Sequence, residues 1–414
     1  MQIAMLSYHT CPLATLGGKD TGGMNVYVRE LTRQFGEMGI RVDVFTRSQD
    51  EHVPHILHDL GYGNRVVHVP AGPEVPLPKQ ELATFLSDFA RGIQVFAHLK
   101  NLKYDIIHSH YWMSGLAAKE LDEIWNVPVI HMFHTLGLMK QRVARDESER
   151  EGEYRIIGER EVIRLADRIV AATPAELAQL QWLYEADTKK IVVIPPGVDI
   201  SHFYPIPEDE AKEFIGIPPC DHMLLFVGRI EPLKGIDTLI EALSIMRKDH
   251  VFVCLTVIGG NPETDQDDNK SEMARLQLLR EKYGLEDLIA FLGSRSQDTL
   301  PYYYSAADAV VVPSQYESFG LVALEAMACG TPVVASQVGG LAFLIQDGVT
   351  GYTVPADDPQ ALADRLTTLV NNPELRQRMG ERAASTAREY RWQRIADRVL
   401  NVYREVTGEI VLGD

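Results

Sequence analysis

The strongest constraint on the fold of this chain is an alternation of short apolar runs with amphipathic segments. The first run, IAMLSY at 3–8, is continuous and of strand length, which is typical of a strand buried in a parallel sheet. Beyond a glycine-rich loop, apolar residues recur every three or four positions, at Met24, Val28, Leu31 and Phe35. This spacing predicts an amphipathic helix, and the run RVDVFTR predicts the next strand. Strands that alternate with helices in this way predict a doubly wound α/β domain.

The alternation begins a second time after a break rich in proline. Pro195, Pro196 and Gly197 precede a polar stretch, which is typical of a linker, and the run HMLLFVGR then restarts the pattern. We therefore predict two Rossmann-like doubly wound domains that face a cleft, at 1–197 and 198–392. The last segment, 393–414, has a strongly amphipathic pattern and is predicted to form a helix that crosses back to the first domain.

The charge balance excludes some classes of partner. The chain has 58 Asp and Glu against 40 Lys and Arg, a formal net charge of −18, so its overall field disfavours nucleic acid and anionic membranes. An anionic ligand must therefore be held by a local group of cations. No apolar run approaches the roughly 20 residues that span a bilayer, so no integral membrane association is expected.

The N-terminus and the cysteines predict a location. The first residues lack the pattern of a signal peptide. The four cysteines lie far apart, without a CxxC pair, which favours unpaired thiols in a reducing compartment. We expect a cytoplasmic protein, either a monomer or a homodimer.

Functional residues should follow the predicted strands, because ligands of doubly wound folds bind beyond the carboxyl ends of the strands. Gly17, Gly18, Gly22 and Gly23 follow the first strand, where backbone N–H groups at a helix N-terminus suit an anion. The loop matches neither GxGxxG nor the P-loop pattern. A plain turn is the alternative interpretation.

The second half carries cations and carboxylates at the same kind of position. Arg229 and Lys234 follow a predicted strand and could neutralise a diphosphate leaving group as its charge develops; the alternative is two solvated surface cations. Glu317 and Glu325 flank a helix start predicted near Phe319 and could accept hydrogen bonds from sugar hydroxyls. Their alternative is a capping carboxylate and a satisfied carboxylate on the helix face.

Two other chemistries are not expected. His108, His110, His131 and His134 are spaced like metal ligands, but no third ligand with suitable spacing accompanies either pair, so no metal site is predicted. The GxSxG elbow of serine hydrolases is missing from the sequence.

Taken together, the motifs resemble the retaining glycosyltransferases of family 4, which have the GT-B fold. The resemblance covers nearly the whole chain and rests on GGMNVYV, HSHYW, the HT at a strand end, PPGVD, GRIEPLKG and the E-x7-E stretch from Glu317 to Glu325. It implies transfer of a sugar from a nucleotide-sugar co-substrate, UDP-linked in the favoured interpretation, without another cofactor and without an obligatory divalent metal. The leaving phosphate oxygen would take the proton of the acceptor, so no separate protein base is implied.

The resemblance also implies roles for individual residues. Those expected to be catalytic are His134, near the reacting carbon, together with Arg229, Lys234 and Glu317. The donor-binding set comprises Gly23, Arg229, Lys234, Arg295, Glu317, Phe319, Gly320, Leu321 and Glu325, with Glu325 on the ribose.

Two subfamilies compete for the acceptor. The stretches DTGG and HTLG look like sucrose-phosphate synthases, which use fructose 6-phosphate and UDP-glucose, and this interpretation is slightly favoured. The SHYW and R-x-x-G-E motifs look like the N-acetylglucosaminyltransferase that acts on inositol phosphate. The implied acceptor residues are Asn25, Lys79, Tyr111, Thr135 and Arg155, the last four at a phosphate site.

Three alternatives remain open. Lys79 and Arg155 could instead pair with neighbouring carboxylates, Glu159 among them. The chain could also be a nucleotide-sugar epimerase of the same fold or a sugar-binding protein without turnover.

Overall fold

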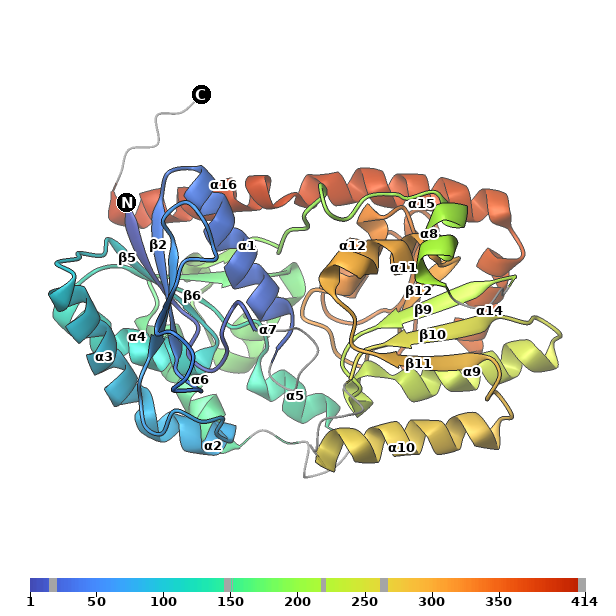
Figure 1. The fold of residues 1–414 in the computed structure, drawn as a ribbon, viewed down its shortest axis with the longest axis horizontal. Coiled ribbons are helices and arrows are strands. Elements are labelled where there is room, and N and C mark those ends of the chain that lie inside the picture. The colour runs from blue at the N-terminus through green and yellow to red at the C-terminus, as the bar shows by residue number, and fades with distance from the viewer. Residues whose placement is uncertain (15–20, 145–149, 151, 217–220, 261–266, 409–414) are drawn as a thin grey trace. The chain divides into compact units, whose positions relative to one another are not determined.

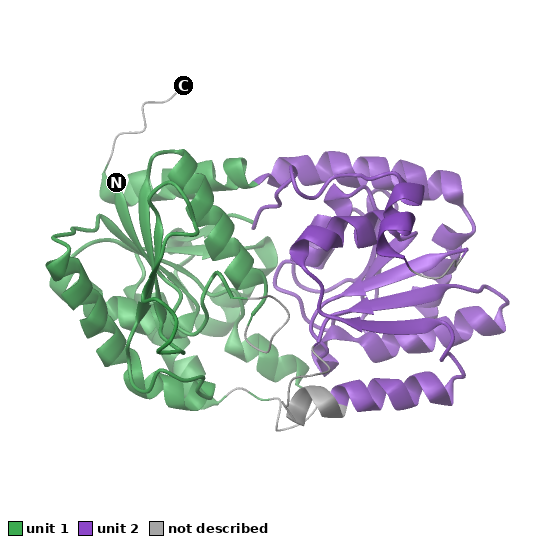
Figure 2. Ribbon diagram, in the orientation of Figure 1, with its two compact units in different colours: residues 1–15, 20–195, 392–414 green, residues 16–19, 196–391 purple. Residues whose placement is uncertain are grey.

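The computed structural model describes residues 1–14, 21–144, 150, 152–216, 221–260 and 267–408. It divides into two compact units, which Figure 2 colours separately. Unit 1 holds the described residues before Pro196 together with those from Trp392 onward, and unit 2 holds Pro196–Arg391. Each unit is built on its own sheet (Figure 1).

The sheet of unit 1 has the strand order β3-β4-β2-β1-β5-β6-β7-β8. Its pairs are parallel except for the short β3, which runs antiparallel to β4. The strands are β1 (Gln2–Leu6), β2 (Arg41–Arg47), β3 (Ile56–Leu57), β4 (Arg65–Val69), β5 (Ile106–His110), β6 (Val129–Met132), β7 (Arg168–Ala171) and β8 (Ile191–Val193). The helices are α1 (Gly23–Glu37), α2 (Lys79–Leu82), α3 (Leu86–Leu99), α4 (Trp112–Trp125), α5 (Gly137–Val143), α6 (Glu153–Leu165), α7 (Pro174–Tyr184) and α16 (Trp392–Thr407).

The sheet of unit 2 has the order β11-β10-β9-β12-β13-β14, and its pairs are parallel. The strands are β9 (Met223–Val227), β10 (Cys254–Ile258), β11 (Ile289–Gly293), β12 (Ala309–Val312), β13 (Val333–Ser336) and β14 (Gly351–Val354). The helices are α8 (Glu208–Ile215), α9 (Ile236–Lys248), α10 (Asp267–Lys282), α11 (Leu300–Ala306), α12 (Leu321–Ala328), α13 (Leu341–Leu344), α14 (Pro359–Val370) and α15 (Pro373–Ala387). Two parallel sheets with intervening helices confirm the predicted pair of doubly wound α/β domains.

The strand order fixes where ligands can bind. In unit 1 the chain builds outward from β1 through β2 and β4, and it resumes on the other side of β1 with β5. In unit 2 it builds outward from β9 through β10 and β11 and resumes with β12. Ligands of open α/β sheets bind at such reversals, beyond the carboxyl ends of the strands. Ligands are therefore expected beyond the carboxyl ends of β1 and β5 in unit 1 and of β9 and β12 in unit 2.

The C-terminal helix α16 packs in unit 1, as predicted. Its buried residues recur at helical spacing: Trp392, Ile395, Ala396, Val399, Leu400, Val402 and Tyr403. The ring of Tyr403 lies 5.4 Å from that of Phe35 in α1, and the ring of Trp392 lies 5.4 Å from that of Tyr27. This apolar stripe is what returns the chain from unit 2 to unit 1.

The expectation of unpaired thiols is wrong at one position. Cys11 and Cys329 are free thiols, but Cys254 at the start of β10 is disulfide-bonded. Cys220 lies outside the described residues. Distance along the chain does not report distance in space, so the cysteine spacing carries no information on the compartment. Among the helices of the described residues, none is both long and apolar enough to cross a membrane.

Candidate functional site

In unit 2, a cation and a carboxylate meet beyond the ends of β9 and β12. Lys234 Nζ lies 2.6 Å from Glu317 Oε2, and both side chains are mostly buried, with 17% and 18% of their surface exposed. The structure thus brings together two residues that were predicted separately. Arg229 also follows β9, but its guanidinium is more exposed and pairs with Glu231 at 2.8 Å.

A glycine explains why Lys234 reaches Glu317. Gly235 has a φ of 67°, and a Cβ atom there would lie 2.1 Å from the carbonyl oxygen of Pro313, just beyond β12. Glycine therefore lets the turn after β9 pack directly on the chain that leaves β12. This close backbone approach positions the Lys234 ammonium against the Glu317 carboxylate.

Two further glycines, Gly339 and Gly340, support the turn that precedes α12. The Gly340 N–H donates to the Glu317 carbonyl at 3.0 Å, and a Cβ atom on Gly339 would lie 1.9 Å from that oxygen. Gly320, with a φ of 102°, ends the turn, so α12 begins at Leu321, two residues after Phe319. No side chain caps this end of α12, whose first N–H groups suit a phosphate.

Two further donor-site residues have polar partners. Glu325 is buried, and the Tyr304 hydroxyl donates to its Oε2 at 2.8 Å. This matches the alternative of a hydrogen-bonded carboxylate on the helix face, so its contact with ribose stays a prediction. Arg295 follows β11, two strands away from β9, and donates to the Tyr303 hydroxyl at 3.3 Å. No role for Tyr304 is visible in the sequence, because its hydrogen bond to Glu325 joins residues on two different helices, α11 and α12.

In unit 1, the four residues of the predicted phosphate site converge. Arg155 Nη2 donates to the carbonyl and hydroxyl oxygens of Thr135 at 2.9 and 3.0 Å. The Tyr111 ring lies 5.0 Å from Arg155 Cζ and 5.9 Å from Lys79 Nζ. Two cations therefore lie near the Tyr111 ring, and one of them also binds Thr135. The four side chains come from two helices and two loops, and together they suit a phosphate.

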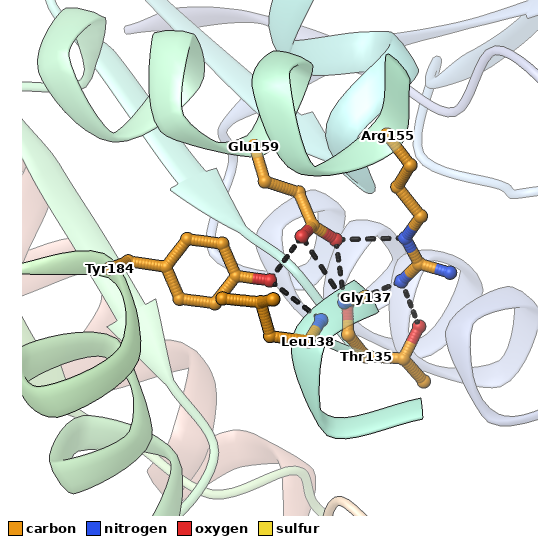
Figure 3. Close-up of polar contacts among 6 residues, drawn as sticks. All are labelled: Thr135, Gly137, Leu138, Arg155, Glu159 and Tyr184. Atoms are coloured by element: carbon orange, nitrogen blue, oxygen red, sulfur yellow. Dashed lines mark hydrogen bonds and ion pairs between the residues drawn. The ribbon is translucent and has the colours of Figure 1, made fainter. Parts of the chain in front are cut away.

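The alternative partner of Arg155 is also present. Arg155 Nε donates to Glu159 Oε1 at 2.8 Å, and the two side chains are 1% and 0% exposed (Figure 3). Glu159 also accepts from the Gly137 N–H and from the Tyr184 hydroxyl. The sequence had indicated Glu159 as a possible partner of Arg155, and a spacing of four residues on a helix is typical of such an ion pair. No role was predicted for Tyr184.

The remaining predicted residues of unit 1 lie at the start of α1. Gly23 is its first residue, and Asn25 is fully buried. The Asn25 amide accepts from the Gly22 N–H at 2.9 Å and donates to Thr10 Oγ1 at 2.8 Å. These bonds tie the chain after β1 to α1, and contact of Asn25 with an acceptor stays a prediction. Gly17 and Gly18 lie outside the described residues.

His134 is partly buried and lies beside a group of buried imidazoles. Its Nε2 lies 2.9 Å from His110 Nδ1, the ring of His110 lies 4.2 Å from that of His108, and His108 Nδ1 lies 2.6 Å from the Tyr403 hydroxyl. Burial lowers the pKa of His134 and of His108 to about 3. A neutral imidazole can hydrogen-bond a sugar hydroxyl but cannot neutralise a phosphate.

Two of the predicted site residues in unit 1, Tyr111 and His134, have an unusual backbone conformation. Tyr111 and His134 follow β5 and β6 with φ angles of 71° and 62°, in the left-handed region that non-glycine residues seldom adopt. Such strain is often found at functional sites. Within the described ranges, no group of three or more His, Cys, Asp or Glu side chains is arranged to hold a metal ion.

Comparisons with known proteins identify the family. Residues 21–202 match the family described as Glycosyltransferase Family 4, and residues 207–386 match Glycosyl transferases group 1. The chain is 40% identical to the D-inositol 3-phosphate glycosyltransferase of Actinosynnema mirum over 407 residues, which cover 97% of this chain and 96% of that protein. It is 40% identical to the enzyme of the same name from Corynebacterium jeikeium over 411 residues, 98% of this chain and 97% of that protein.

Solved structures show the same fold. The sucrose-phosphate synthase of Thermosynechococcus elongatus superimposes with a TM-score of 0.91 at 32% identity, covering 99% of this chain and 100% of that chain. Anabaena HepE in complex with UDP-glucose superimposes with a TM-score of 0.76 at 20% identity, covering 98% of this chain and 100% of that one.

Proposed function

The chain belongs to the family 4 glycosyltransferases and has the GT-B fold, and from this membership we propose that it transfers a sugar from a UDP-linked donor to a phosphorylated acceptor with retention of anomeric configuration. The observation that carries the acceptor class is the convergence of Lys79, Tyr111, Thr135 and Arg155 in unit 1. In a chain with a net charge of −18, a dianion needs such a local group of cations.

The proposed chemistry uses the residues of unit 2 for the leaving group. The bond between the anomeric carbon and the diphosphate breaks, and a bond to the acceptor oxygen forms on the same face of the sugar. The acceptor proton passes to the departing phosphate oxygen. Arg229 and Lys234 neutralise the charge that grows there, with the N–H groups at the start of α12 as further donors. Glu317 orients Lys234 and accepts from sugar hydroxyls, and neutral His134 orients the sugar.

Two acceptors are proposed, each on its own observation. D-inositol 3-phosphate is favoured by relatives that are 40% identical over nearly the whole chain and are named for that substrate. Fructose 6-phosphate, which the sequence motifs slightly favoured, is supported by the sucrose-phosphate synthase at 32% identity. The matching donors are UDP-N-acetylglucosamine and UDP-glucose. The nucleotide-sugar donor and the phosphorylated acceptor are both anions, which do not cross a bilayer unaided. We propose that the enzyme meets them in the cytoplasm.

One panel of assays tests the proposal. The protein is incubated with UDP-glucose, ADP-glucose or UDP-N-acetylglucosamine, against inositol 3-phosphate, fructose 6-phosphate and their unphosphorylated counterparts, and products are identified by mass. We expect one phosphorylated product, formed equally well with EDTA present. Equal turnover of the unphosphorylated acceptors would overturn the acceptor class. Conversion of the donor alone, without transfer, would favour an epimerase.

A further inference from the structure

The carboxylate of Glu159 is the centre of a buried network that no proposed catalytic step uses. It is fully buried and accepts from Arg155 Nε at 2.8 Å and from the Gly137 N–H at 3.0 and 3.1 Å. The Tyr184 hydroxyl donates to it as well and accepts from the Leu138 N–H at 3.0 Å (Figure 3). A buried carboxylate is tolerated only when donors surround it in this way.

The network holds the loop that carries two site residues. Gly137 and Leu138 begin α5, and the loop before them contains His134 and Thr135. Glu159 lies on α6 and Tyr184 at the end of α7, so the loop is tied to two helices at once. A Cβ atom on Gly137 would lie 2.6 Å from Ile156 Cδ1 and 3.0 Å from Glu159 Oε2, so glycine is what allows the carboxylate to approach.

The same network fixes the orientation of Arg155. Its Nε is held by Glu159, and its Nη2 is held by the two oxygens of Thr135. Two bonds from different nitrogens define the plane of a guanidinium, and the Tyr111 ring lies 5.0 Å from its centre. An arginine held in this way does not lose further side-chain freedom when an anion binds.

The Tyr184 hydroxyl stays a donor across the working pH range. Burial, reinforced by the neighbouring Glu159, raises the pKa of Tyr184 above its ordinary value, so the phenol stays protonated. Removal of this hydroxyl would deprive the Glu159 carboxylate of one donor and the Leu138 N–H of its acceptor. The bonds of Arg155 to Glu159 and Thr135 would not be removed.

We propose that Glu159 and Tyr184 are positioning residues that determine the preference for a phosphorylated acceptor, by holding Arg155 and the 134–138 loop in the geometry that binds the phosphate. This inference rests on the proposed function. The two residues act through Arg155 and Thr135, and neither needs to touch a substrate.

The test compares acceptor preference in conservative variants. Tyr184→Phe keeps the ring, which packs 5.7 Å from the Arg160 guanidinium, and removes only the hydroxyl. Glu159→Gln keeps the shape and removes the charge. We expect Tyr184→Phe to raise KM for the phosphorylated acceptor about tenfold and Glu159→Gln about a hundredfold. Donor KM should change little, and the ratio of kcat/KM between phosphorylated and unphosphorylated acceptors should fall accordingly.

Tyr104→Phe is the matched control. Tyr104 is a buried tyrosine of unit 1 whose hydroxyl donates to the carboxylate of Asp43 at 2.7 Å. It precedes β5, whereas Tyr111 follows the other end of that strand. Its loss should lower stability and leave the preference unchanged. In an Arg155→Ala background, Tyr184→Phe should alter the preference much less, because one of the two phosphate-binding groups that it positions is gone.

The outcomes separate the two proposals. If the wild-type enzyme shows no preference for a phosphorylated acceptor, the proposed function fails, and this inference fails with it. If the wild type shows the preference and folded Tyr184→Phe keeps it in full, the positioning role is overturned and the proposed function stands. Should Glu159→Gln not fold, Tyr184→Phe alone decides, since circular dichroism and thermal unfolding show whether that milder variant is native.

Discussion

Lys234 is the residue whose charge the proposed reaction uses most directly. It is mostly buried against Glu317, so its ammonium is already desolvated and oriented before a donor binds. We predict that Lys234→Ala lowers kcat on the order of 10²–10³-fold, because the charge that it meets grows toward the transition state. Acceptor KM should change much less. Steady-state kinetics with both substrates varied measure the two effects.

Lys212→Ala is the control for that variant, since Lys212 forms an exposed pair with Glu208 in the same unit. It should retain full activity. A kcat near the wild-type value in Lys234→Ala would show that the leaving-group role is wrong.

Arg155 is expected to serve both the stability of unit 1 and the proposed recognition of the acceptor phosphate. Because its partner Glu159 is fully buried, Arg155→Ala leaves an uncompensated charge, and we predict a loss of about 3–5 kcal/mol in the free energy of unfolding. Urea unfolding followed by circular dichroism measures it. Lys119→Ala, which removes one partner of the exposed pair between Lys119 and Glu161, should have little effect. An equally small effect of Arg155→Ala would contradict the buried network.

The residues that sequence analysis found and missed differ in a physical way. Lys79, Tyr111, Thr135 and Arg155 carry chemistry that a family motif identifies, and the structure brings them together. Tyr184 and Tyr304 each donate a hydrogen bond to a carboxylate on another helix. Their partners are Glu159 and Glu325, which lie 25 and 21 residues away along the chain. Periodicity indicates which face of a helix is buried but not which polar group on another element it meets, so such partners need the structure.

At the scale of elements, α16 shows what periodicity does predict. Its apolar stripe predicted a helix that returns to the first domain, and Trp392 and Tyr403 anchor it there. The helix start predicted near Phe319 lies two residues further on, at Leu321. Gly320, with a φ of 102°, cannot belong to α12, and the left-handed requirement at that position is not visible in composition.

The polar contact of α16 gives an element-scale prediction. The Tyr403 hydroxyl lies 2.6 Å from His108 Nδ1, and both groups are buried. Tyr403→Phe leaves the imidazole without this partner, so we predict a loss of about 1–3 kcal/mol in the free energy of unfolding. The urea midpoint should fall while the slope of the transition stays constant. Tyr62→Phe, at a largely exposed tyrosine, should leave the midpoint unchanged, and an equal midpoint in Tyr403→Phe would argue against the contact.

At the scale of the whole molecule, the buried histidines predict sensitivity to acid. Burial lowers the pKa of His108 and His134 to about 3 and holds those of His110 and His131 well below 6.5. Below about pH 6.5 the unfolded chain therefore binds protons that the folded chain does not. As the pH is lowered below 6.5, the free energy of unfolding should therefore fall by up to about 1.4 kcal/mol per pH unit for each histidine. Glu176 opposes this, since burial raises its pKa to about 7 and acid favours its folded form, but it is one group against four.

Urea midpoints at pH 7.5, 6.5 and 5.5 measure this dependence. His108→Asn should reduce the slope of stability against pH, because one titrating group is removed. A midpoint that stays constant or rises between pH 6.5 and 5.5 would contradict the prediction.

The division of labour between the units predicts motion. The proposed donor residues Lys234 and Glu317 lie in unit 2, whereas Arg155 and His134 lie in unit 1. Transfer requires the acceptor oxygen to come within about 3–3.5 Å of the anomeric carbon. Among the described residues, the chain passes between the units at Pro195–Pro196 and at Arg391–Trp392. Two prolines restrict the backbone at the first connection, and at the second the Trp392 ring packs against that of Tyr27. We therefore predict that the arrangement of the two units changes when donor and acceptor are both bound. We predict that the radius of gyration from small-angle X-ray scattering falls when UDP and the acceptor phosphate bind together. Lys234→Ala should need more UDP for the same compaction, and a radius that stays constant when both ligands saturate the wild-type protein would rule out closure.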